Sequence, residues 1–359
     1  MPPLRVLVVG CGNMGASHAR AYRSLGDFEL VGLCSRQPHS RERLAAALGG
    51  VPTYPSAARA IAELRPDAVS INTWPDSHAE LALSSLAGGA HVFLEKPLAT
   101  TEAAARAVIA AARQHRRKLV VGYILRVHPA WQRFIELARG LGKPLVMRMN
   151  LNQQSSGAQW ETHKNLMTSM SPIVDCGVHY VDVMCQMTRA APLRVSAIGA
   201  RLSDEIAPDM YNYGQLQVVF ADGSVGWYES GWGPMISETA YFVKDVIGPR
   251  GSVSIVDRSD GAERERSAEI GTHTATRRLR VHHASRDGRG ERARADELLD
   301  TSDEPDHDTL CRLEQEYFLR AIRDDLDLTE HQDDALRSLC IVLAADASVR
   351  RGETVVLRP

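Results

Sequence analysis

The sequence lacks the features that mark metal-binding, membrane and nucleic-acid-binding proteins. Its six cysteines are scattered, with no CxxC pair or other metal-ligand spacing, so we expect reduced thiols, a cytoplasmic location and no metal site. No apolar run approaches the roughly 20 residues that span a bilayer. The chain passes from Met1 almost directly into an apolar run, so we expect no signal peptide. A formal net charge of −2 lacks the basic excess of a nucleic-acid binder.

What remains is the composition of an ordinary globular protein. Hydrophobic residues make up 44% of the chain and charged residues 24%. Because 359 residues exceed what one hydrophobic core usually fills, we expect two domains. The change of pattern along the chain places them at residues 1–124 and 125–359.

A glycine-rich turn lies near the start of the chain. Residues 4–9 form a short run rich in valine and leucine, and GCGNMG follows at once before a helical stretch. This is GxGxxG in the strand–turn–helix context that dinucleotide binding requires. Gly10 permits the turn, Gly12 lets the backbone approach a pyrophosphate, and Gly15 lets helix and strand pack closely. The predicted cofactor contacts here are Gly10, Gly12, Asn13, Met14 and Gly15.

The end of the second predicted strand indicates which dinucleotide is bound. About 20 residues after the turn, an NAD-binding unit usually has an acidic residue for the ribose 2′-hydroxyl. This chain has Ser35 and Arg36 there, with Arg41 close behind. A carboxylate would repel a 2′-phosphate, whereas a hydroxyl and a guanidinium bind it, so the pattern favours NADP over NAD. The alternative is that these arginines form a solvated helix face and that either cofactor binds.

A second charged turn ends the run VFLEKP at residues 92–97. Strands alternate with helices up to residue 122, which predicts a doubly wound parallel sheet, the Rossmann fold. Ligands bind at the carboxyl ends of the strands in such sheets. The predicted contacts at these ends are Thr73, His78, Glu95 and Lys96. The alternative is an ordinary strand end whose Glu95 and Lys96 face water.

The pattern changes from about residue 126 onward. Apolar and polar residues alternate in several stretches, and Asp222-Gly223 between two of them is a strong hairpin sequence. We therefore expect an α+β domain with an open-faced, mostly antiparallel sheet. Residues 258–308 are rich in charge and poor in apolar side chains, which predicts a solvated or mobile excursion with a strand at 276–282. A lid or a partner surface is the alternative. The alternating stretches are 145–152, 193–202, 211–221, 224–232, 241–248 and 252–257.

A helix predicted over residues 173–187 carries three ionisable residues on one face. Asp175, His179 and Asp182 stand at positions i, i+4 and i+7 of an otherwise apolar helix. Such a stripe needs a cleft or a partner. Spacing alone leaves open a capping aspartate and a core histidine whose hydrogen bonds are satisfied.

Together these motifs resemble those of the Gfo/Idh/MocA oxidoreductases, the family of glucose/fructose oxidoreductase and inositol dehydrogenase. The resemblance rests on GCGNMG, the turn at 75–78, the EKP of 95–97 and the DCGVH of 175–179, and it covers nearly the whole chain. It implies a Rossmann domain, a substrate-binding and oligomerisation domain, and a homodimer or homotetramer. The implied reaction is hydride transfer between a nicotinamide and a secondary alcohol or ketone of a sugar, a sugar derivative or a cyclitol.

The resemblance also implies the catalytic residues. Lys96 would hydrogen-bond the reacting oxygen, and Asp175 would bind a substrate hydroxyl or hold the other two residues in place. His179 would act as general acid or base, because its ordinary pKa of about 6.5 suits proton transfer near neutrality. Asp182 is left as an orienting or structural residue.

The sequence indicates the substrate-binding residues less clearly than the catalytic ones. Arg126 matches the family's arginine after the sixth strand, and Asn152, Trp160 and His163 would supply polar groups and an aromatic platform for a sugar. The alternative is a packed tryptophan with surface polar residues. Residues 169–174 depart from the glycine-rich run that many members carry, so the identity of the substrate stays open.

Two other functions stay open. One is a redox-neutral glycosidase that uses a bound NAD transiently, as some relatives of the family do. The other is a non-catalytic cofactor sensor, which the intact Lys96, Asp175 and His179 argue against, because a sensor needs no proton relay. Neither a nucleic acid nor a membrane is an expected partner.

Overall fold

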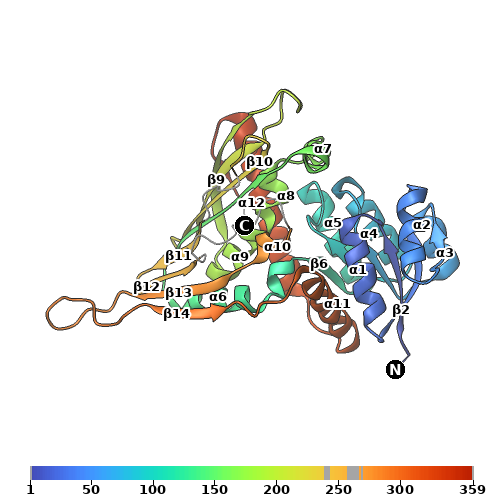
Figure 1. The fold of residues 1–359 in the computed structure, drawn as a ribbon, viewed down its shortest axis with the longest axis horizontal. Coiled ribbons are helices and arrows are strands. Elements are labelled where there is room, and N and C mark those ends of the chain that lie inside the picture. Colours follow the sequence, from blue (N-terminus) through green and yellow to red (C-terminus); the bar gives the residue numbers. More distant parts are fainter. Residues whose placement is uncertain (1, 238–242, 257–266, 268–269, 358–359) are drawn as a thin grey trace. The chain divides into compact units, whose positions relative to one another are not determined.

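The computed structural model describes residues 2–237, 243–256, 267 and 270–357. The chain divides into two compact units (Figure 1), and each is described by itself. The first unit holds residues 1–127 and 306–336, and the second holds 128–305 and 337–359. The sequence places the division close to the observed one, at 124, but leaves 306–336 in the second domain.

The first unit contains the predicted doubly wound parallel sheet. Its six strands lie in the order β3-β2-β1-β4-β5-β6, and every pairing is parallel. Helix α1 contacts β1 and β2, and α4 contacts β4 and β5. The strands are β1 (Leu4–Val9), β2 (Phe28–Cys34), β3 (Thr53–Tyr54), β4 (Ala68–Ile71), β5 (His91–Glu95) and β6 (Leu119–Gly122). The helices are α1 (Asn13–Ser24), α2 (Pro38–Ala47), α3 (Ala57–Leu64), α4 (His78–Ala87), α5 (Glu102–Gln114) and α11 (His307–Arg323).

Local chemistry explains where these helices begin and end. Thr101 caps α5 by accepting a hydrogen bond from the backbone N–H of Ala104 at 3.2 Å. Gly88 follows the last residue of α4. Helix α2 begins at Pro38, because proline's fixed φ suits the first turn of a helix.

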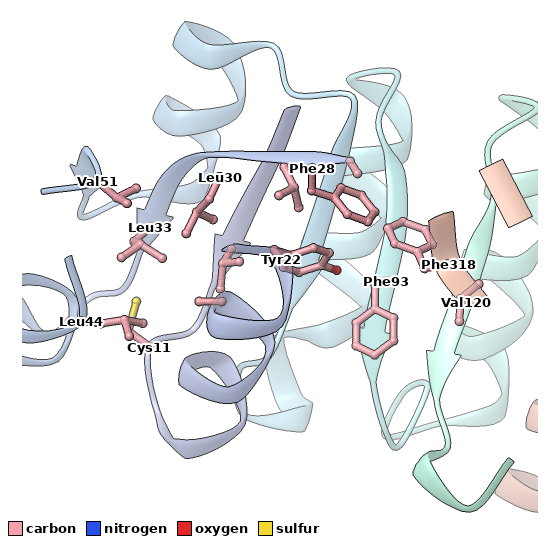
Figure 2. Close-up of a cluster of buried hydrophobic side chains, with 14 of the residues drawn as sticks. Cys11, Tyr22, Phe28, Leu30, Leu33, Leu44, Val51, Phe93, Val120 and Phe318 are labelled. Atoms are coloured by element: carbon pink, nitrogen blue, oxygen red, sulfur yellow. The ribbon is translucent and has the colours of Figure 1, made fainter. Parts of the chain in front are cut away.

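An aromatic group shows why α11 belongs to the first unit. Phe318 of α11 stacks on Phe28 of β2 at 6.4 Å between ring centroids and lies 6.1 Å from Phe93 of β5. Tyr22 of α1 meets Phe28 edge-on at 4.8 Å (Figure 2). The apolar side chains of α11 therefore complete a core that the first 127 residues begin.

The second unit is built on a nine-stranded sheet in the order β14-β13-β12-β11-β7-β10-β9-β8-β15. Strands β7 and β10 run parallel, and the other pairings are antiparallel, so the predicted mostly antiparallel sheet is confirmed. Gly223 has φ +81° in the hairpin that joins β9 to β10, as its sequence predicts. The strands are β7 (Val146–Gln154), β8 (Pro192–Ala200), β9 (Tyr213–Phe220), β10 (Val225–Gly233), β11 (Lys244–Gly248), β12 (Gly251–Ile255), β13 (Arg277–His283), β14 (Glu297–Thr301) and β15 (Val355–Val356).

Helices α6, α8 and α9 pack on this sheet and on one another. The predicted helix over 173–187 is wrong as one element: it is divided at Cys176 into α8 and α9. Gly177 opens α9 beside Tyr228, whose ring would lie 2.9 Å from a Cβ at this position. The other helices of this unit are α6 (Pro129–Gly140), α7 (Gly157–Leu166), α8 (Pro172–Asp175), α9 (Gly177–Thr188) and α10 (Ile270–Thr274), while α12 (Thr329–Arg351) begins in the first unit.

The charged stretch 258–308 is only partly the excursion that its composition predicts. Its second half forms β13 and β14 at one edge of the sheet (Figure 1), with Leu279 and Val281 turned into the core between exposed or half-buried basic residues. The strand predicted at 276–282 is thus confirmed. Residues 257–266 and the first residues of the predicted strand 241–248 lie outside the described ranges. Within those ranges, every helix is too short or too polar to cross a membrane.

Candidate functional site

The glycine turn between β1 and α1 is built from backbone alone. Gly10 has φ +96°, and a Cβ there would stand 2.3 Å from the carbonyl oxygen of Asn72. A Cβ on Gly15 would stand 1.9 Å from the carbonyl oxygen of Gly10, so helix and turn are in direct contact. At Gly12, by contrast, a Cβ would meet no described atom within 4 Å. Gly12 therefore leaves open space at the amino end of α1.

The amino end of α1 offers an anion site. Gly12 is the N-cap and has no side chain to cap the helix, and the first turn of the helix holds no acidic residue. Its backbone N–H groups and the positive end of the helix dipole are therefore available to phosphate oxygens. Asn13 is exposed and Met14 is half-buried beside them.

The loop after β2 separates the two predicted arginine contacts. Arg41 turns back, donating from Nη1 to the carbonyl oxygens of Ser35 at 3.0 Å and Arg36 at 3.4 Å. Its side chain is 13% exposed, so it shapes the loop. Arg36 is exposed, and no hydrogen bond or ion pair joins its side chain to another described residue. The guanidinium that a ligand can reach is therefore that of Arg36.

His78, at the start of α4, ties two strand ends together. Its Nδ1 lies 2.8 Å from the carbonyl oxygen of Pro97, and its Nε2 lies 3.0 Å from that of Thr73. Burial lowers the pKa of His78, although both carbonyls oppose this shift. The ring is 0% exposed, so His78 holds the turns after β4 and β5 and has no surface for a cofactor, contrary to its predicted contact.

Glu95, at the end of β5, is also held by protein groups. Its Oε1 lies 2.7 Å from Nε2 of His18 on α1, and its Oε2 accepts the backbone N–H of Lys96 at 3.2 Å. Gln315 of α11 donates to Nδ1 of His18 at 2.9 Å. Glu95 is buried, so it orients the Lys96 backbone, contrary to its predicted contact with the cofactor. The Lys96 side chain itself is half-buried.

Arg126 ends a single helical turn after β6. Its Nη1 lies 2.9 Å from Nδ1 of His331, and its guanidinium lies 5.1 Å from the ring centroid of Tyr123. Both contacts are within the first unit. They give the half-buried guanidinium a defined direction.

In the second unit, the divided helix presents Asp175 at the end of α8 and His179 in the first turn of α9. Both are half-buried. Asp182 is 1% exposed and accepts a hydrogen bond from Nε2 of Gln186 at 2.9 Å. Of the three residues predicted on one face, two are thus accessible, and Asp182 is structural.

A side-chain network lies beneath Asp175. Gln153 of β7 accepts from the indole N–H of Trp232 at 2.7 Å and from the Sγ of Cys176 at 3.4 Å. His163 stacks on Trp232 at 4.4 Å between centroids. Burial lowers the pKa of His163 to about 4, although the Asp175 carboxylate opposes this shift. No sequence pattern indicated Gln153 or Trp232, because their partners come from other elements.

A second network fixes the start of α8. Ser171, the N-cap of α8, donates to the Asp346 carboxylate at 2.6 Å. The Tyr211 hydroxyl lies 2.8 Å from the Ser171 Oγ and also hydrogen-bonds Asp346. These contacts determine where the helix that carries Asp175 begins.

The other predicted substrate residues of this unit are largely engaged. Trp160 is 5% exposed, and its indole N–H donates to Glu205 at 3.1 Å. Its burial favours the packed tryptophan over the aromatic platform. His163 is buried as described above. Asn152 is half-buried and donates to Glu229 at 2.7 Å, while its Oδ1 has no hydrogen-bond partner among the described residues.

Two family models match the chain. The oxidoreductase family with an NAD-binding Rossmann fold, Gfo/Idh/MocA, matches residues 4–123. The Gfo/Idh/MocA C-terminal domain matches residues 137–253.

The chain is also similar to curated relatives and to solved structures. A UDP-N-acetylglucosamine 3-dehydrogenase of Acidithiobacillus ferrooxidans is 30% identical over 55% of this chain and 58% of its own length. Inositol 2-dehydrogenase 3 of Saccharopolyspora erythraea is 32% identical over 50% and 52%. The match thus spans little more than half the length of these relatives. A Bordetella pertussis dehydrogenase solved with NADH and UDP-GlcNAcA is 19% identical, with a TM-score of 0.74 over 99% of both chains, which shows a shared fold.

Proposed function

Because the chain belongs to the Gfo/Idh/MocA oxidoreductase family, we propose that it is an NAD(P)-dependent dehydrogenase or reductase. Its substrate would be a secondary alcohol or ketone of a sugar, a sugar derivative or a cyclitol. The names of two relatives, a UDP-N-acetylglucosamine 3-dehydrogenase and an inositol 2-dehydrogenase, support this substrate class. The observation that carries the proposal is the glycine turn with its open space at Gly12.

The turn suits the pyrophosphate of a dinucleotide. The open space at Gly12 lets phosphate oxygens reach the backbone N–H groups of α1, which the helix dipole also favours. Lys96 follows the carboxyl end of β5, in the same unit, where a Rossmann sheet binds its ligands. A bound nicotinamide accepts or donates the hydride.

The preferred cofactor in this proposal is NADP. The residue after Ser35 is an exposed arginine, not the acidic residue that binds a ribose 2′-hydroxyl. Arg36 is free of protein partners among the described residues, so its guanidinium can form charge-assisted hydrogen bonds with a 2′-phosphate. Arg41 acts indirectly in this proposal, by holding the carbonyl oxygens of Ser35 and Arg36.

The chemical roles follow from what a secondary alcohol requires. When hydride leaves the carbon, the hydroxyl proton must leave as well, and charge on the oxygen must be stabilised. We assign proton transfer to His179, stabilisation of the oxygen to Lys96, and a hydrogen bond to a substrate hydroxyl to Asp175. The half-buried positions of these three side chains leave part of each accessible.

Self-association also belongs to the proposal. Strands β7, β8, β10 and β11 of the second unit carry large apolar side chains that are 38% to 63% exposed, and exposing such side chains to water is costly. A second copy of the chain would cover them in a dimer or a tetramer. These side chains are Val146, Leu193, Ile198, Val225 and Ile247.

A fluorescence titration tests the cofactor assignment. NADPH and NADH are titrated into the native protein, Arg36→Ala and Arg43→Ala, where Arg43 is another exposed arginine, on α2. NADPH should bind at least tenfold more tightly than NADH to the native protein and to Arg43→Ala. This preference should collapse in Arg36→Ala. Equal or tighter binding of NADH to the native protein would overturn the NADP assignment, and binding of neither would overturn the enzyme proposal.

A substrate screen tests the reaction. UDP-N-acetylglucosamine, myo-inositol and simple glucosides are offered with the oxidised cofactor, and the corresponding ketones with the reduced one. Activity should fall at least a thousandfold in His179→Asn, with cofactor affinity unchanged, because proton transfer is lost. The surface variant His39→Asn should keep full activity. Hydrolysis of a glycoside without net production of reduced cofactor would contradict the dehydrogenase proposal.

A further inference from the structure

A buried group of potential metal ligands lies between α1 and α11 of the first unit. His18 of α1 and Cys311 and Glu314 of α11 each offer one ligand atom, and these atoms all lie within 4.8 Å of one another. Cys311 and Glu314 stand at i and i+3, so both point from one face of α11. That face packs on α1, the helix that carries His18. All three residues are buried.

Glu314 is the feature of this group that needs an explanation. Its side chain is 3% exposed, and neither carboxyl oxygen has a hydrogen-bond partner in the part of the chain that the structure describes. A buried polar group without a partner costs on the order of 1 to 3 kcal/mol, and such groups are rare in folded proteins. The amide oxygen of Gln315, the next residue, also lacks a partner among the described residues. Three buried side-chain oxygens of two neighbouring residues of α11 therefore accept no hydrogen bond from a described N–H or O–H.

His18 is already oriented as metal-binding histidines are. Its Nε2 lies 2.7 Å from the Glu95 carboxylate, the arrangement in which a carboxylate holds one ring nitrogen and the metal takes the other. The remaining Nδ1 faces α11, where the Gln315 amide nitrogen lies 2.9 Å away. An ion bound at Nδ1 would displace this N–H donor, and only the amide oxygen of Gln315 could then face the ion.

Cys311 has a further nitrogen beside it. The Nε2 of His307, one helical turn earlier on α11, lies 3.6 Å from the Cys311 Sγ. Two ligands of one tetrahedral zinc ion stand about 3.3 to 3.8 Å apart, given Zn–S and Zn–N bonds of about 2.3 and 2.0 Å. The distance between the His307 nitrogen and the Cys311 sulfur already fits this range. The ligand atoms of His18, Cys311 and Glu314 lie within 4.8 Å of one another, so they would have to move about 1 Å closer to bind one ion.

We propose that His18, Cys311 and Glu314 bind a zinc ion, with His307 or the Gln315 amide oxygen as fourth ligand. One thiolate, imidazole nitrogen and one carboxylate form a ligand set that suits Zn²⁺ and disfavours Mg²⁺ and Ca²⁺, which prefer oxygen ligands alone. On binding, the ion replaces the protons of the Cys311 thiol and the Glu314 carboxyl, so two protons are released and two negative charges balance the ion. No redox step is involved.

The consequence is structural and does not depend on the proposed oxidoreductase activity. Residues 306–336 join the first unit although nearly two hundred residues separate them from residue 127. An ion shared by α1 and α11 would fasten this segment to the sheet. Ligands that bind only the folded protein raise its stability by mass action.

Cobalt substitution tests the site, because Co²⁺ bound to a thiolate gives a near-ultraviolet charge-transfer band. The full chain is treated with a chelator, passed through a desalting column, loaded with Co²⁺ or Zn²⁺, and desalted again. The native protein should retain one ion per chain and show the band, and Zn²⁺ should remove it. Cys311→Ser should lose the band and at least tenfold in metal affinity.

Two further variants keep the test decisive. Cys185→Ser changes another fully buried thiol, in the second unit, and should bind metal as the native protein does. Glu314→Gln has nearly the shape of the protonated glutamate, so it should fold normally, as measured by circular dichroism, and bind at least tenfold more weakly. If the native protein retains no ion, or if Cys311→Ser and Glu314→Gln retain as much as it does, the site does not exist.

Discussion

Backbone contacts build the glycine turn of the first unit, whereas side-chain networks surround Asp175 in the second unit. We call these networks, which join Gln153 to Trp232 and Cys176 and Ser171 to Asp346, the bed. In the turn, backbone atoms meet backbone atoms, and a Cβ on Gly10 or Gly15 would overlap a carbonyl group. In the bed, side chains hold side chains: Gln153 bonds Trp232 and Cys176, and Ser171 bonds Asp346.

This difference determines how each part should respond to substitution. Two peptide groups in contact cannot move apart without moving a strand or a helix, so the turn should tolerate no side chain at its contact points. A single substitution in a side-chain network removes only the hydrogen bonds of that residue. Each substitution in the bed should therefore lower the unfolding free energy by a limited amount. The predictions below are ordered by expected effect, and each tests one side of this comparison.

The largest effect is expected from Gly15→Val. Its Cβ would stand 1.9 Å from the carbonyl oxygen of Gly10, and its methyl groups would need still more room. We expect a loss of at least about 4 kcal/mol of unfolding free energy, or no folded protein at all. Urea unfolding followed by circular dichroism measures it. Gly26→Ala is the matched control, because a Cβ at Gly26 meets no described atom within 4 Å, and it should change stability by less than about 0.5 kcal/mol. If Gly15→Val folds with native stability, the backbone of the turn can move to make room for a side chain.

The next effect is expected from Gln153→Leu in the bed. Leucine has nearly the volume of glutamine but leaves the buried indole N–H of Trp232 without its acceptor and removes one acceptor of the Cys176 thiol. Unpartnered buried donors of this kind cost about 1 to 3 kcal/mol in total. Gln217→Leu, at an exposed position of β9, should change stability by less than about 0.5 kcal/mol. Urea unfolding of the two variants measures the difference. Equal unfolding curves would show that the network around Gln153 does not contribute to stability.

The comparison also explains what the sequence can and cannot predict. The turn was predictable because its requirements are local: three glycines within six residues, between a strand and a helix. The networks of the bed join residues that are far apart, such as Gln153 and Trp232, which are 79 positions apart. Neither residue carries a local pattern that would indicate its partner.

The errors in the predicted site have the same origin. Both Arg36 and Arg41 have the charge that a 2′-phosphate requires, but only the fold shows that Arg41 turns back onto the carbonyl oxygens of the loop. Glu95 ends β5 and His78 begins the helix after β4, close in sequence to the strand ends where ligands bind, yet both are buried and bonded to protein groups. Position along a strand was predictable, whereas side-chain direction depends on packing between distant elements.

A smaller effect, dependent on pH, is expected from His163. Burial lowers its pKa from 6.5 to about 4, so the folded protein keeps the ring neutral while the unfolded chain binds a proton. Stability should therefore fall as the pH drops from 6.5 towards 4, and the share due to His163 should reach about 2 kcal/mol at pH 5. Urea unfolding of the native protein and of His163→Gln at pH 7.5 and pH 5 measures this share. The variant should lose less stability over this interval, by about that amount, whereas the exposed control His39→Gln should follow the native protein. Identical losses in His163→Gln and the native protein would contradict the neutral buried ring.

The smallest effect on stability, and the sharpest test of the turn, is expected from Gly12→Ala. Gly12 has φ −78° and ψ −164°, which alanine adopts without strain, and its Cβ would meet no described atom within 4 Å. Unfolding free energy should therefore change by less than about 0.5 kcal/mol, in contrast to Gly15→Val in the same turn. The new methyl group would occupy the space in which the proposed pyrophosphate lies, so affinity for NADPH and NADH should fall at least tenfold. Urea unfolding and fluorescence titration on one preparation separate the two quantities. If affinity stays at the native value while stability is unchanged, phosphate does not approach Gly12, and the observation that carries the cofactor proposal loses its force. If stability falls instead, the turn is closed by its own backbone at this position too, and its open space is not an anion site.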